Sequence, residues 1–558
     1  MLGQQGCITF FAPCRRDSIA AMTSIVQPHD AVSVTDQLTK ALAGVVAAAD
    51  IREDPASRAL MAEDIWCEPD GDVAVVVTPR SLDQLAGVMR AAHSLGVPVA
   101  PRGAGMSYTA SHVAAAPDTL SLDLSGMYRV LAVNPMDMTV TVEPGCTWAT
   151  LNAALQPRGL RTPFWGPMSG LASTIGGGLS QLNAMLGASR YGTSSESVVA
   201  LTMVLADGTL LRTGARGKDG NHPFYRHFGP DLTGIFCGDS GTLGIKGEIV
   251  LRLMRAPQAE AYASFSFPTG AAMLTALADI ARADVASETC GFDPGLTRVR
   301  LKRASLAADL KSLGAVITKE GSLAKGLVSA AKVAFGGRKF IEQEDFSLHL
   351  IAEGRSAAGV AADLAEMRRI AAAHGGREVE STIARMIRAV PFPPLNSMLG
   401  PEGEAWVPVH GMVNLSAAPA LFEALQALFA ELAPTFAAQG IYTGYLFTSV
   451  STNAITIEPV FYWPHGWRPI HEVHVEPAHL ARLPRLAPNP AATAIVADAK
   501  QRVVDLFAQY GCGHFQIGRT YPYRESRDDA SRALLDAIKA VVDPQGQLNP
   551  GGIGFPVQ

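Results

Sequence analysis

Glycine-rich segments with hydroxyl side chains are the parts of this 558-residue chain whose residue types and spacing best suit chemistry. They are PRGAGMS at 101–107, STIGGGLSQ at 173–181 and GDSGTLGI at 238–245. Glycine frees backbone N–H groups to form anion-binding nests, and it lets the main chain approach a flat ring closely. A cofactor that joins a pyrophosphate to a planar ring would use both properties. Each segment alone could be a tight turn, but three in one region favour a shared ligand.

The first glycine segment matches neither common nucleotide-binding motif. In the pattern G-x-G-x-x-G, Tyr108 takes the place of the third glycine after Gly103 and Gly105. A P-loop needs Lys followed by Ser or Thr, and no such pair follows this segment. Its ligand must therefore be held in a different way.

The elements around the first segment place it at the edge of a sheet. The apolar, β-branched run 72–77 predicts a strand that is buried on both faces. Ser81 and Gln84 form a capping-box pattern that starts a helix, and Gly96 suits its end. A second strand follows at 97–100. Ligands of open α/β sheets bind at the carboxyl edge that such a unit reaches.

The rest of the chain divides into two kinds of pattern. Residues 118–124 predict a further strand, and 129–145 and 196–214 predict hairpins. Beyond about residue 256, alanine-rich helical stretches alternate with strands, which indicates a second α+β domain. We predict a loose N-terminal tail at 1–35, a first domain at 36–255, a second domain at 256–500 and a C-terminal helical segment at 501–558 that returns to the first domain.

Composition narrows the class of protein. Hydrophobic residues make up 48% and charged residues 17% of the chain, which indicates a folded protein. The net charge of −5, without a dense basic run, argues against nucleic-acid binding. No apolar stretch reaches the ~18 residues of a membrane span. The seven scattered cysteines are expected to be reduced thiols. The first residues lack the order of a signal peptide, so we expect a cytoplasmic protein, and a homodimer is left open.

In their order, these segments resemble the flavin domain of the vanillyl-alcohol oxidase and p-cresol methylhydroxylase (PCMH) superfamily. The resemblance covers residues 73–255 and the closing DPQGQLNPG at 543–551, and the loops are most similar to the D-lactate dehydrogenase and glycolate oxidase branch. It implies an α+β fold. A PCMH-type FAD-binding domain of two subdomains would be joined to an α+β substrate (cap) domain, whose antiparallel sheet is flanked by helices.

The resemblance also implies FAD as the cofactor. The first segment would wrap the pyrophosphate, and the later ones would flank the adenine and the isoalloxazine. The implied contacts are Arg102, Gly103, Ala104, Gly105, Met106, Ser107, Ser173, Thr174, Gly177, Gly178, Gly241, Gly244, Ile245 and Asn549. Some members tether FAD through a histidine just after the first loop. Here Tyr108 stands near that position and His112 comes several residues later, so we predict noncovalent FAD.

The reaction implied by the family is hydride removal from a C–H bond next to oxygen, with a base from the protein. A D-2-hydroxy acid such as D-lactate or glycolate is the preferred substrate class, with Arg388 binding its carboxylate and His514 as the base. A para-substituted phenol or benzylic alcohol is the alternative, with Tyr108 binding the phenol and Arg519 following in the late pocket segment. A third reading is a structural module that binds FAD without turnover.

A metal site is not predicted, because the metal motif of the hydroxy-acid branch is absent from 443–459. The spacing of His465, His471 and His474 could serve a metal, but unrelated surface or pocket histidines are the preferred reading. The partners expected are a small-molecule substrate and an electron acceptor. The sequence does not indicate whether the acceptor is O2, a quinone or a cytochrome.

Overall fold

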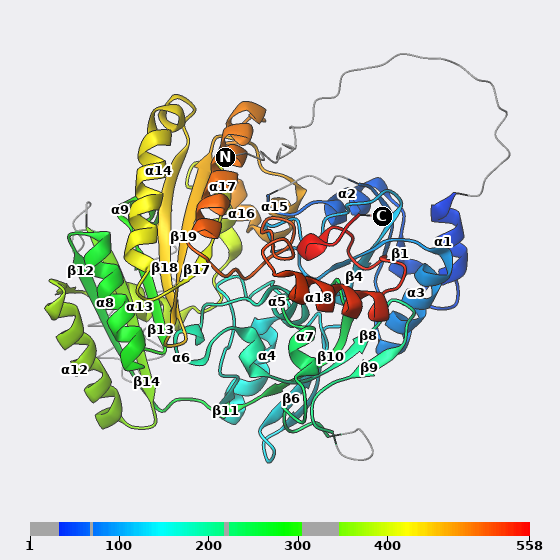
Figure 1. Cartoon of the computed structure of the whole chain (residues 1–558), viewed down its shortest axis with the longest axis horizontal. Coiled ribbons are helices and arrows are strands. Elements are labelled where there is room, and N and C mark those ends of the chain that lie inside the picture. The colour runs from blue at the N-terminus through cyan, green and yellow to red at the C-terminus, as the bar shows by residue number, and fades with distance from the viewer. Residues whose placement is uncertain (1–32, 67–70, 217–221, 304–344, 558) are drawn as a thin grey trace, which may run out of the picture.

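The computed structural model describes residues 33–66, 71–216, 222–303 and 345–557. Figure 1 shows two halves side by side, and the red C-terminal end of the chain lies with the blue and cyan N-terminal half. The predicted tail at 1–35 lies almost wholly outside the described residues. The first described helix, α1 (Val34–Leu42), already packs into the N-terminal half.

A small, mainly parallel sheet forms the first layer of the N-terminal half. Its order is β1-β2-β4-β3, and β2, β4 and β3 run parallel. The strands are β1 (Ile51–Arg52), β2 (Val73–Val77), β3 (Val99–Arg102) and β4 (Thr119–Asp123). All of β2 is buried, because α1 and α3 (Leu82–Leu95) cover one face and α2 (Pro55–Ala62) covers the other.

The start and the end of α3 confirm the predicted signals. Ser81 Oγ accepts a hydrogen bond from Gln84 N at 3.2 Å, and Gly96 ends the helix with φ +64°. β3 then runs straight into the first glycine segment. The strand–helix–strand unit therefore delivers this segment to the carboxyl edge of the sheet, as the sequence predicted.

An antiparallel sheet completes the N-terminal half. Its order is β5-β6-β10-β8-β9, and both predicted hairpins are present in it. The strands are β5 (Val130–Asn134), β6 (Thr139–Val142), β8 (Val198–Val204), β9 (Leu210–Arg212) and β10 (Ile245–Arg252), with a separate pair β7 (Leu160–Arg161) and β11 (Met254–Arg255). The helices here are α4 (Trp148–Leu155), α5 (Ile175–Gln181), α6 (Ala188–Tyr191), α7 (Leu232–Ile235) and α18 (Asp529–Val542).

The other half, the cap, is built on one antiparallel sheet. Its order is β15-β12-β14-β13-β18-β19-β16, with β17 also paired to β19. The strands are β12 (Ala259–Phe267), β13 (Glu288–Phe292), β14 (Phe346–Gly354), β15 (Arg377–Val379), β16 (Ala405–Pro408), β17 (Gly411–Asn414), β18 (Tyr442–Val450) and β19 (Ala454–Trp463). Together, the parallel and antiparallel sheets with their helices confirm the predicted α+β class.

Long helices lie against the cap sheet (Figure 1). They are α8 (Gly270–Ala283), α12 (Ala357–Ala373), α14 (Ala418–Ala438) and α17 (Pro490–Gln509). The shorter helices of this half are α9 (Pro294–Arg303), α13 (Thr382–Ala389), α15 (Pro469–His474) and α16 (Pro477–Leu480). Helix α17 spans the predicted boundary at residue 500, and its Val503 and Phe507 are buried in the core cluster that also holds residues of α14.

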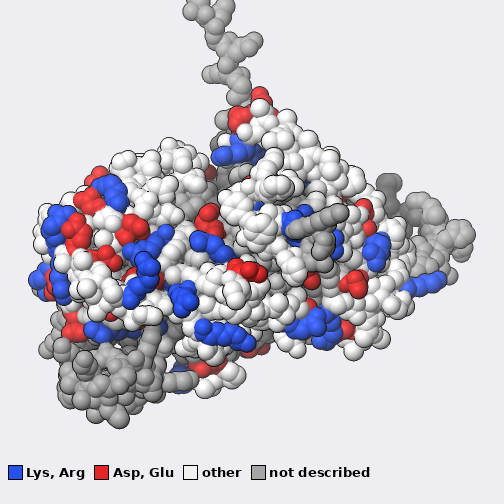
Figure 2. Space-filling view, turned by 90° about the horizontal axis from the view of Figure 1, so that it is seen from below, with Lys and Arg blue, Asp and Glu red and all other residues white. Residues whose placement is uncertain are grey.

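Within the described residues, α14 is the one helix long and apolar enough to span a membrane. Its length and composition are weak evidence, since a core helix of a soluble protein has the same properties. Leu421, Phe422 and Leu425 are buried in the cap core, so packing accounts for the apolar character of α14. On the face shown in Figure 2, charges of both signs are interspersed over the cap half.

Candidate functional site

The first glycine segment turns at Gly105, where φ is +73°. A Cβ at Gly105 would lie 2.3 Å from Nη2 of Arg102, so both the backbone angle and the space require glycine. Arg102 itself is buried and donates from Nη1 to the carbonyl oxygens of Glu63 at 2.6 Å and Met61 at 3.3 Å. Burial lowers the pKa of this guanidinium to about 10. The Arg102 side chain therefore supports the loop, and contact with a cofactor at this position would come from the backbone.

The cap reaches this first loop through α15. His474 Nε2 donates a hydrogen bond to the carbonyl oxygen of Ala104 at 3.0 Å. Next in the loop, the hydroxyls of Ser107 and Thr109 lie 3.0 Å apart and are buried. Met106 is only partly buried and packs against the main core. The first loop is thus held from the cap side as well as from its own domain.

The second glycine segment forms the start of α5. Thr174 caps the helix by accepting a hydrogen bond from Gly177 N at 3.2 Å. A Cβ at Gly103 would lie 2.4 Å from Thr174 Oγ1, so the first and second loops touch. Gly178 faces the Asn183 side chain closely, whereas a Cβ at Gly177 would meet only Thr174.

The third glycine segment lies on the end of β3. Gly241 has φ +73°, and a Cβ there would lie 2.6 Å from Cγ of Pro101. Lys246 Nζ donates to Asp239 Oδ1 at 2.8 Å and to Ser180 Oγ at 2.7 Å, which fixes this loop to α5. Ile245 is buried in the apolar core of the parallel sheet, and Gly244 precedes it against the side chain of Met203. Ile245 therefore anchors β10 by its side chain.

Asn549 joins the third segment to the chain that follows the first segment. Its Nδ2 donates to the carbonyl oxygens of Ser111 and Ser240, both at 2.6 Å. The positions predicted from the three segments and from the C-terminal end are therefore brought together at one edge of the parallel sheet.

Buried polar atoms without a hydrogen-bond partner test whether FAD fits these loops. Within the described residues, they include Ser173 Oγ, Gln181 Oε1 and Asn549 Oδ1. Leaving such an atom unpaired costs free energy, so a cluster of them points to a polar ligand. Glycine backbone beside orphaned hydroxyl and amide groups suits a pyrophosphate with its attached sugar and ring. The loops therefore fit FAD.

A cluster of ring side chains lies where the first loop meets the cap and the C-terminal segment. We call it the aromatic cluster: Tyr108, Trp406, His410, His514, Phe515 and Tyr521. The Tyr108 hydroxyl accepts a hydrogen bond from Gln516 Nε2 at 2.9 Å, and burial raises the pKa of this phenol well above its usual value. Tyr108 is therefore a neutral, fixed phenol.

One ring nitrogen of His514 forms a hydrogen bond, and this hydrogen bond defines the tautomer of the ring. Its Nδ1 lies 2.9 Å from the carbonyl oxygen of His410, and a carbonyl only accepts, so Nδ1 carries the proton. The ring stacks on Tyr521 with a centroid separation of 3.9 Å. Burial lowers the pKa of His514, which keeps Nε2 unprotonated near neutral pH. This is the arrangement that a general base needs.

Glu458 adds a carboxyl group beside the aromatic cluster. Pro408 pairs with Val460 and Gly411 pairs with Ile457, so this unbroken register sets His410 opposite Glu458. Burial raises the pKa of Glu458 to about 7. A carboxyl with such a pKa can be neutral or charged under physiological conditions.

Arg388 does not lie with His514, and this corrects the expectation that both converge on one substrate. Its guanidinium forms ion pairs with Glu288 and Glu353, each at 2.9 Å, and with Glu260 at 3.4 Å. Arg161 adds a bidentate pair to Glu353. Although burial opposes ionisation, the two guanidinium groups lower the pKa of Glu353 to about 2. We call these five residues the buried ion cluster, in which the positive charge of Arg388 is already compensated.

Arg519 and the three cap histidines also have defined positions. Arg519 donates from Nη2 to the carbonyl oxygen of Val113, so it braces the chain after the first loop. His465 accepts from Asn489 N at 2.9 Å, and His471 Nδ1 accepts from Arg468 N at 3.1 Å. His474 is bound to the first loop. In the described part of the chain, no group of three or more His, Cys, Asp or Glu residues could hold a metal.

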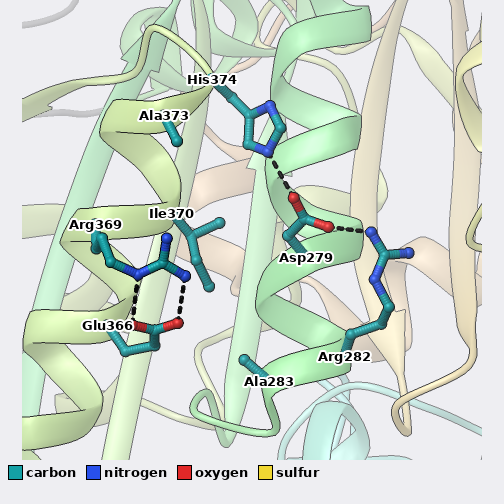
Figure 3. A pocket seen from close by; sticks show the side chains of 8 residues that line it. All are labelled: Asp279, Arg282, Ala283, Glu366, Arg369, Ile370, Ala373 and His374. Carbon is teal, nitrogen blue, oxygen red and sulfur yellow. Dashed lines mark hydrogen bonds and ion pairs between the residues drawn. The ribbon is translucent and has the colours of Figure 1, made fainter.

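A hollow of about 320 Å3 lies away from these residues, between α8 and α12 (Figure 3). Its charged groups pair with one another. Asp279 binds His374 and Arg282, and Glu366 binds Arg369. With its charges compensated and no orphaned polar atom lining it, this hollow is not a candidate for the redox site.

The sequence reasoning missed His410, Glu458 and Lys500, and it noted Gln516 and Tyr521 in the late pocket segment without making them site residues. Lys500 is buried, and its Nζ lies 3.4 Å from the carbonyl oxygen of Tyr108 and 4.5 Å above the Trp66 ring. A weak signal for Glu458 was present in the sequence. It is an isolated acid within the apolar run 454–463, where strand alternation would bring it to one face.

Family models match both halves of the chain. Residues 73–214 match the model of the FAD binding domain, and residues 256–553 match that of the C-terminal domain of FAD linked oxidases. Together these matches span most of both halves of the molecule. They confirm FAD as the cofactor and the superfamily that the sequence resembles.

Relatives with curated names match about a third of this chain. A mitochondrial D-lactate dehydrogenase [cytochrome] of Arabidopsis thaliana is 35% identical over 195 residues, which are 35% of this chain and 33% of the relative. A probable mitochondrial D-lactate dehydrogenase of Danio rerio is 34% identical over 215 residues, 38% of this chain and 41% of the relative. Glycolate oxidase subunit GlcD of Bacillus subtilis is 32% identical over 184 residues, 33% of this chain and 37% of the relative. The matches thus span well under half the length of these relatives.

Solved structures share the whole fold at low identity. A p-cresol methylhydroxylase with substrate bound has a TM-score of 0.69 and 16% identity, and the match covers 94% of this chain and 97% of that chain. An alkyldihydroxyacetonephosphate synthase has a TM-score of 0.65 and 18% identity, with 94% and 87% coverage. The predicted PCMH-type architecture is therefore confirmed.

Proposed function

We propose that this chain, which belongs to the FAD-linked oxidases, removes a hydride from a C–H bond next to oxygen on a small alcohol. Bound FAD would supply the hydride acceptor, held by the three glycine loops and Asn549. The chain's own residues must then bind the alcohol, orient it and take its hydroxyl proton.

The proton acceptor in this proposal is His514. Its Nδ1–H is bound to the His410 carbonyl oxygen, which leaves Nε2 as the free acceptor of the ring. Stacking on Tyr521 fixes the plane of the imidazole, and the Tyr521 hydroxyl is itself fixed by His410 N at 2.9 Å. A base that is held by such neighbours loses little orientational freedom during the reaction.

The substrate class that the geometry favours is a benzylic alcohol or a para-substituted phenol. In a benzylic alcohol the hydride leaves the carbon that bears the hydroxyl, whereas in a 4-alkylphenol it would leave the benzylic carbon and the proton would leave the phenol hydroxyl. The carrying observation is the Tyr108–Gln516 hydrogen bond inside the aromatic cluster, while the guanidinium of Arg388 is neutralised in another region. A carboxylate substrate would need a cation, whereas an aromatic substrate needs ring contacts and neutral hydrogen-bonding groups.

A D-2-hydroxy acid is the second candidate, because the relatives that match about a third of this chain include D-lactate dehydrogenases. In that case Lys500, buried beside the Tyr108 carbonyl, would take the carboxylate in place of Arg388. This alternative predicts that Lys500→Met raises KM for hydroxy acids and leaves phenol turnover unchanged.

Anaerobic bleaching of the flavin spectrum tests the two substrate classes directly. We expect 4-alkylphenols or benzylic alcohols to bleach the flavin and D-lactate and glycolate to leave it oxidised. Bleaching by hydroxy acids alone would transfer the proposal to the second candidate. A flavin that no alcohol of either class reduces would favour a structural FAD module.

Noncovalent FAD and a cytoplasmic location also remain proposals. Acid precipitation should release the yellow colour into the supernatant, because Tyr108 stands near the position where tethering members carry histidine. Colour that stays with the pellet would contradict noncovalent binding. Cell fractionation decides the location, and several relatives are named as mitochondrial proteins.

A further inference from the structure

We propose that the C-terminal residues 543–555 act as a latch whose docking is energetically coupled to FAD binding, and that Lys539 is its positioning residue. The proposal rests on FAD as the cofactor of this chain and is independent of the substrate. Three sets of contacts carry it.

The backbone of the latch extends the parallel sheet. Val99 N donates to the carbonyl oxygen of Gln547 at 2.8 Å, and Asn549 N donates to the carbonyl oxygen of Val99 at 2.8 Å. Leu548 between them is fully buried in the core of that sheet. The latch therefore lies along β3, the strand whose carboxyl end carries the first glycine segment.

The Asn549 side chain ties two flavin loops together. Its Nδ2 binds the carbonyl oxygens of Ser111, after the first segment, and Ser240, in the third. Asn549 and Ser240 both have positive φ, +43° and +50°, which non-glycine residues adopt only when their surroundings hold them there. Asn549 Oδ1 is buried and accepts no hydrogen bond from the described residues. This oxygen is therefore available to accept a hydrogen bond from bound FAD.

Lys539 holds the latch against the third loop. Its buried Nζ donates to the carbonyl oxygens of Thr242 at 2.8 Å and Leu548 at 3.0 Å, and to Asp543 Oδ2 at 2.6 Å. Asp543 in turn accepts from the backbone N–H groups of Gln547 and Leu548 at 3.1 and 2.7 Å. A single ammonium group thus joins α18, the latch and the third glycine segment.

Coupling follows because the same loops bind both the latch and the cofactor. If the latch orders the first and third loops, it raises FAD affinity, and FAD must then stabilise the docked latch by the same factor. A purely structural C-terminus would lower stability when damaged but would leave FAD affinity of the folded protein unchanged. This difference separates the two readings.

The variant Lys539→Met tests the coupling, with Arg532→Met as the matched control. Arg532 lies on the same helix and forms an ion pair with the exposed Asp529. The readout is the FAD dissociation constant of the full chain, from flavin fluorescence on titration of the apoprotein. We expect Lys539→Met to weaken FAD binding roughly tenfold or more and Arg532→Met to match the wild type. An unchanged constant in Lys539→Met would overturn the proposal.

Hydrogen exchange of the wild-type chain provides a test that needs no variant to fold. Amides of residues 543–555 should exchange at least severalfold more slowly with FAD bound than without it, whereas those of the surface helix α12 should not change. Equal exchange of the latch in both states would also overturn the proposal. The two proposals fail separately, since normal FAD binding without reduction by any alcohol contradicts only the proposed reaction.

Discussion

The buried ion cluster and the aromatic cluster both include residues from strands of the cap sheet, yet they differ in how their polar groups are paired. Around Arg388, three carboxylates and a second guanidinium satisfy one another's charge. Around Tyr108, burial raises the pKa of the phenols and lowers the pKa of the histidines, so the rings are neutral. A region of paired charges holds the fold, whereas a cluster of neutral rings with hydrogen-bonding groups suits an uncharged aromatic ligand. The contrast assigns stability to Arg388 and chemistry to His514 and Tyr108.

The largest expected effect is on stability at the buried ion cluster. Arg388→Met should lower the free energy of unfolding by about 3–5 kcal/mol, because it leaves buried carboxylates without a partner. Denaturant unfolding measures this loss. Arg368→Met is the matched control, since the Arg368–Glu378 pair is exposed and such a pair contributes under about 1 kcal/mol. A stable Arg388→Met protein with a raised KM would return Arg388 to the substrate site.

The next effect is on turnover at the aromatic cluster. His514→Ala should lower kcat by about a hundredfold or more, because general bases contribute that much to proton transfer. Its thermal unfolding should change little, since the ring is only partly buried. Steady-state kinetics measure the change, with His374→Ala on the distant hollow as the control. Turnover that survives the loss of His514 would leave Glu458 as the base to examine.

A smaller effect distinguishes the substrate classes. Tyr108→Phe removes one hydroxyl and should lower kcat/KM for phenols by about tenfold, which is the contribution of one hydrogen bond. Turnover of hydroxy acids should be nearly unaffected. The ratio of the two kcat/KM values in variant and wild type is the measurement. Equal losses for both substrates would mean that Tyr108 acts through packing.

The smallest effect concerns pH and Glu458. Its pKa in the folded protein is raised to about 7 from 4.5, so the folded state holds the proton more tightly than the unfolded state. Protonation of Glu458 therefore makes its full contribution to the free energy of unfolding below about pH 4.5. This contribution is lost as the pH rises through 7. We expect Glu458→Gln to reduce this pH-dependent loss by on the order of 1 kcal/mol. The free energy of unfolding is measured at pH 5 and at pH 8. A Glu458→Gln protein that loses as much of it between these two pH values as the wild type does would contradict this prediction.

The flavin loops could be predicted from the sequence because their signals are local. The ends of α3 are marked by Ser81, Gln84 and Gly96, whose capping contacts involve residues only a few positions away. Glycine is favoured at position 105 by the positive φ of that residue itself. The role of Arg102 could not be inferred, because its side chain binds carbonyl groups some forty residues earlier in the chain.

The residues that the cap contributes to the site were also harder to predict, because their partners lie far away in the sequence. Arg388 looked like a free cation in the sequence, and only the sheet order of β12, β14 and β13 brings three glutamates to it. His514 was singled out by its segment, but its partner His410 lies more than a hundred positions away. Cross-strand pairing of this kind follows from tertiary register, which no local pattern in one sequence encodes.

The pairing of the C-terminal end with β3 has a consequence for the order of folding. The contact between Asn549 and Ser111 joins residues 438 positions apart, so the whole cap must be synthesised before it can form. Contacts of such long range slow folding, because the intervening chain must be closed into a loop before the contact stabilises anything. During synthesis the cap can form while the parallel sheet still lacks its last strand. The cofactor site of this protein can therefore be completed only after the whole cap has been synthesised.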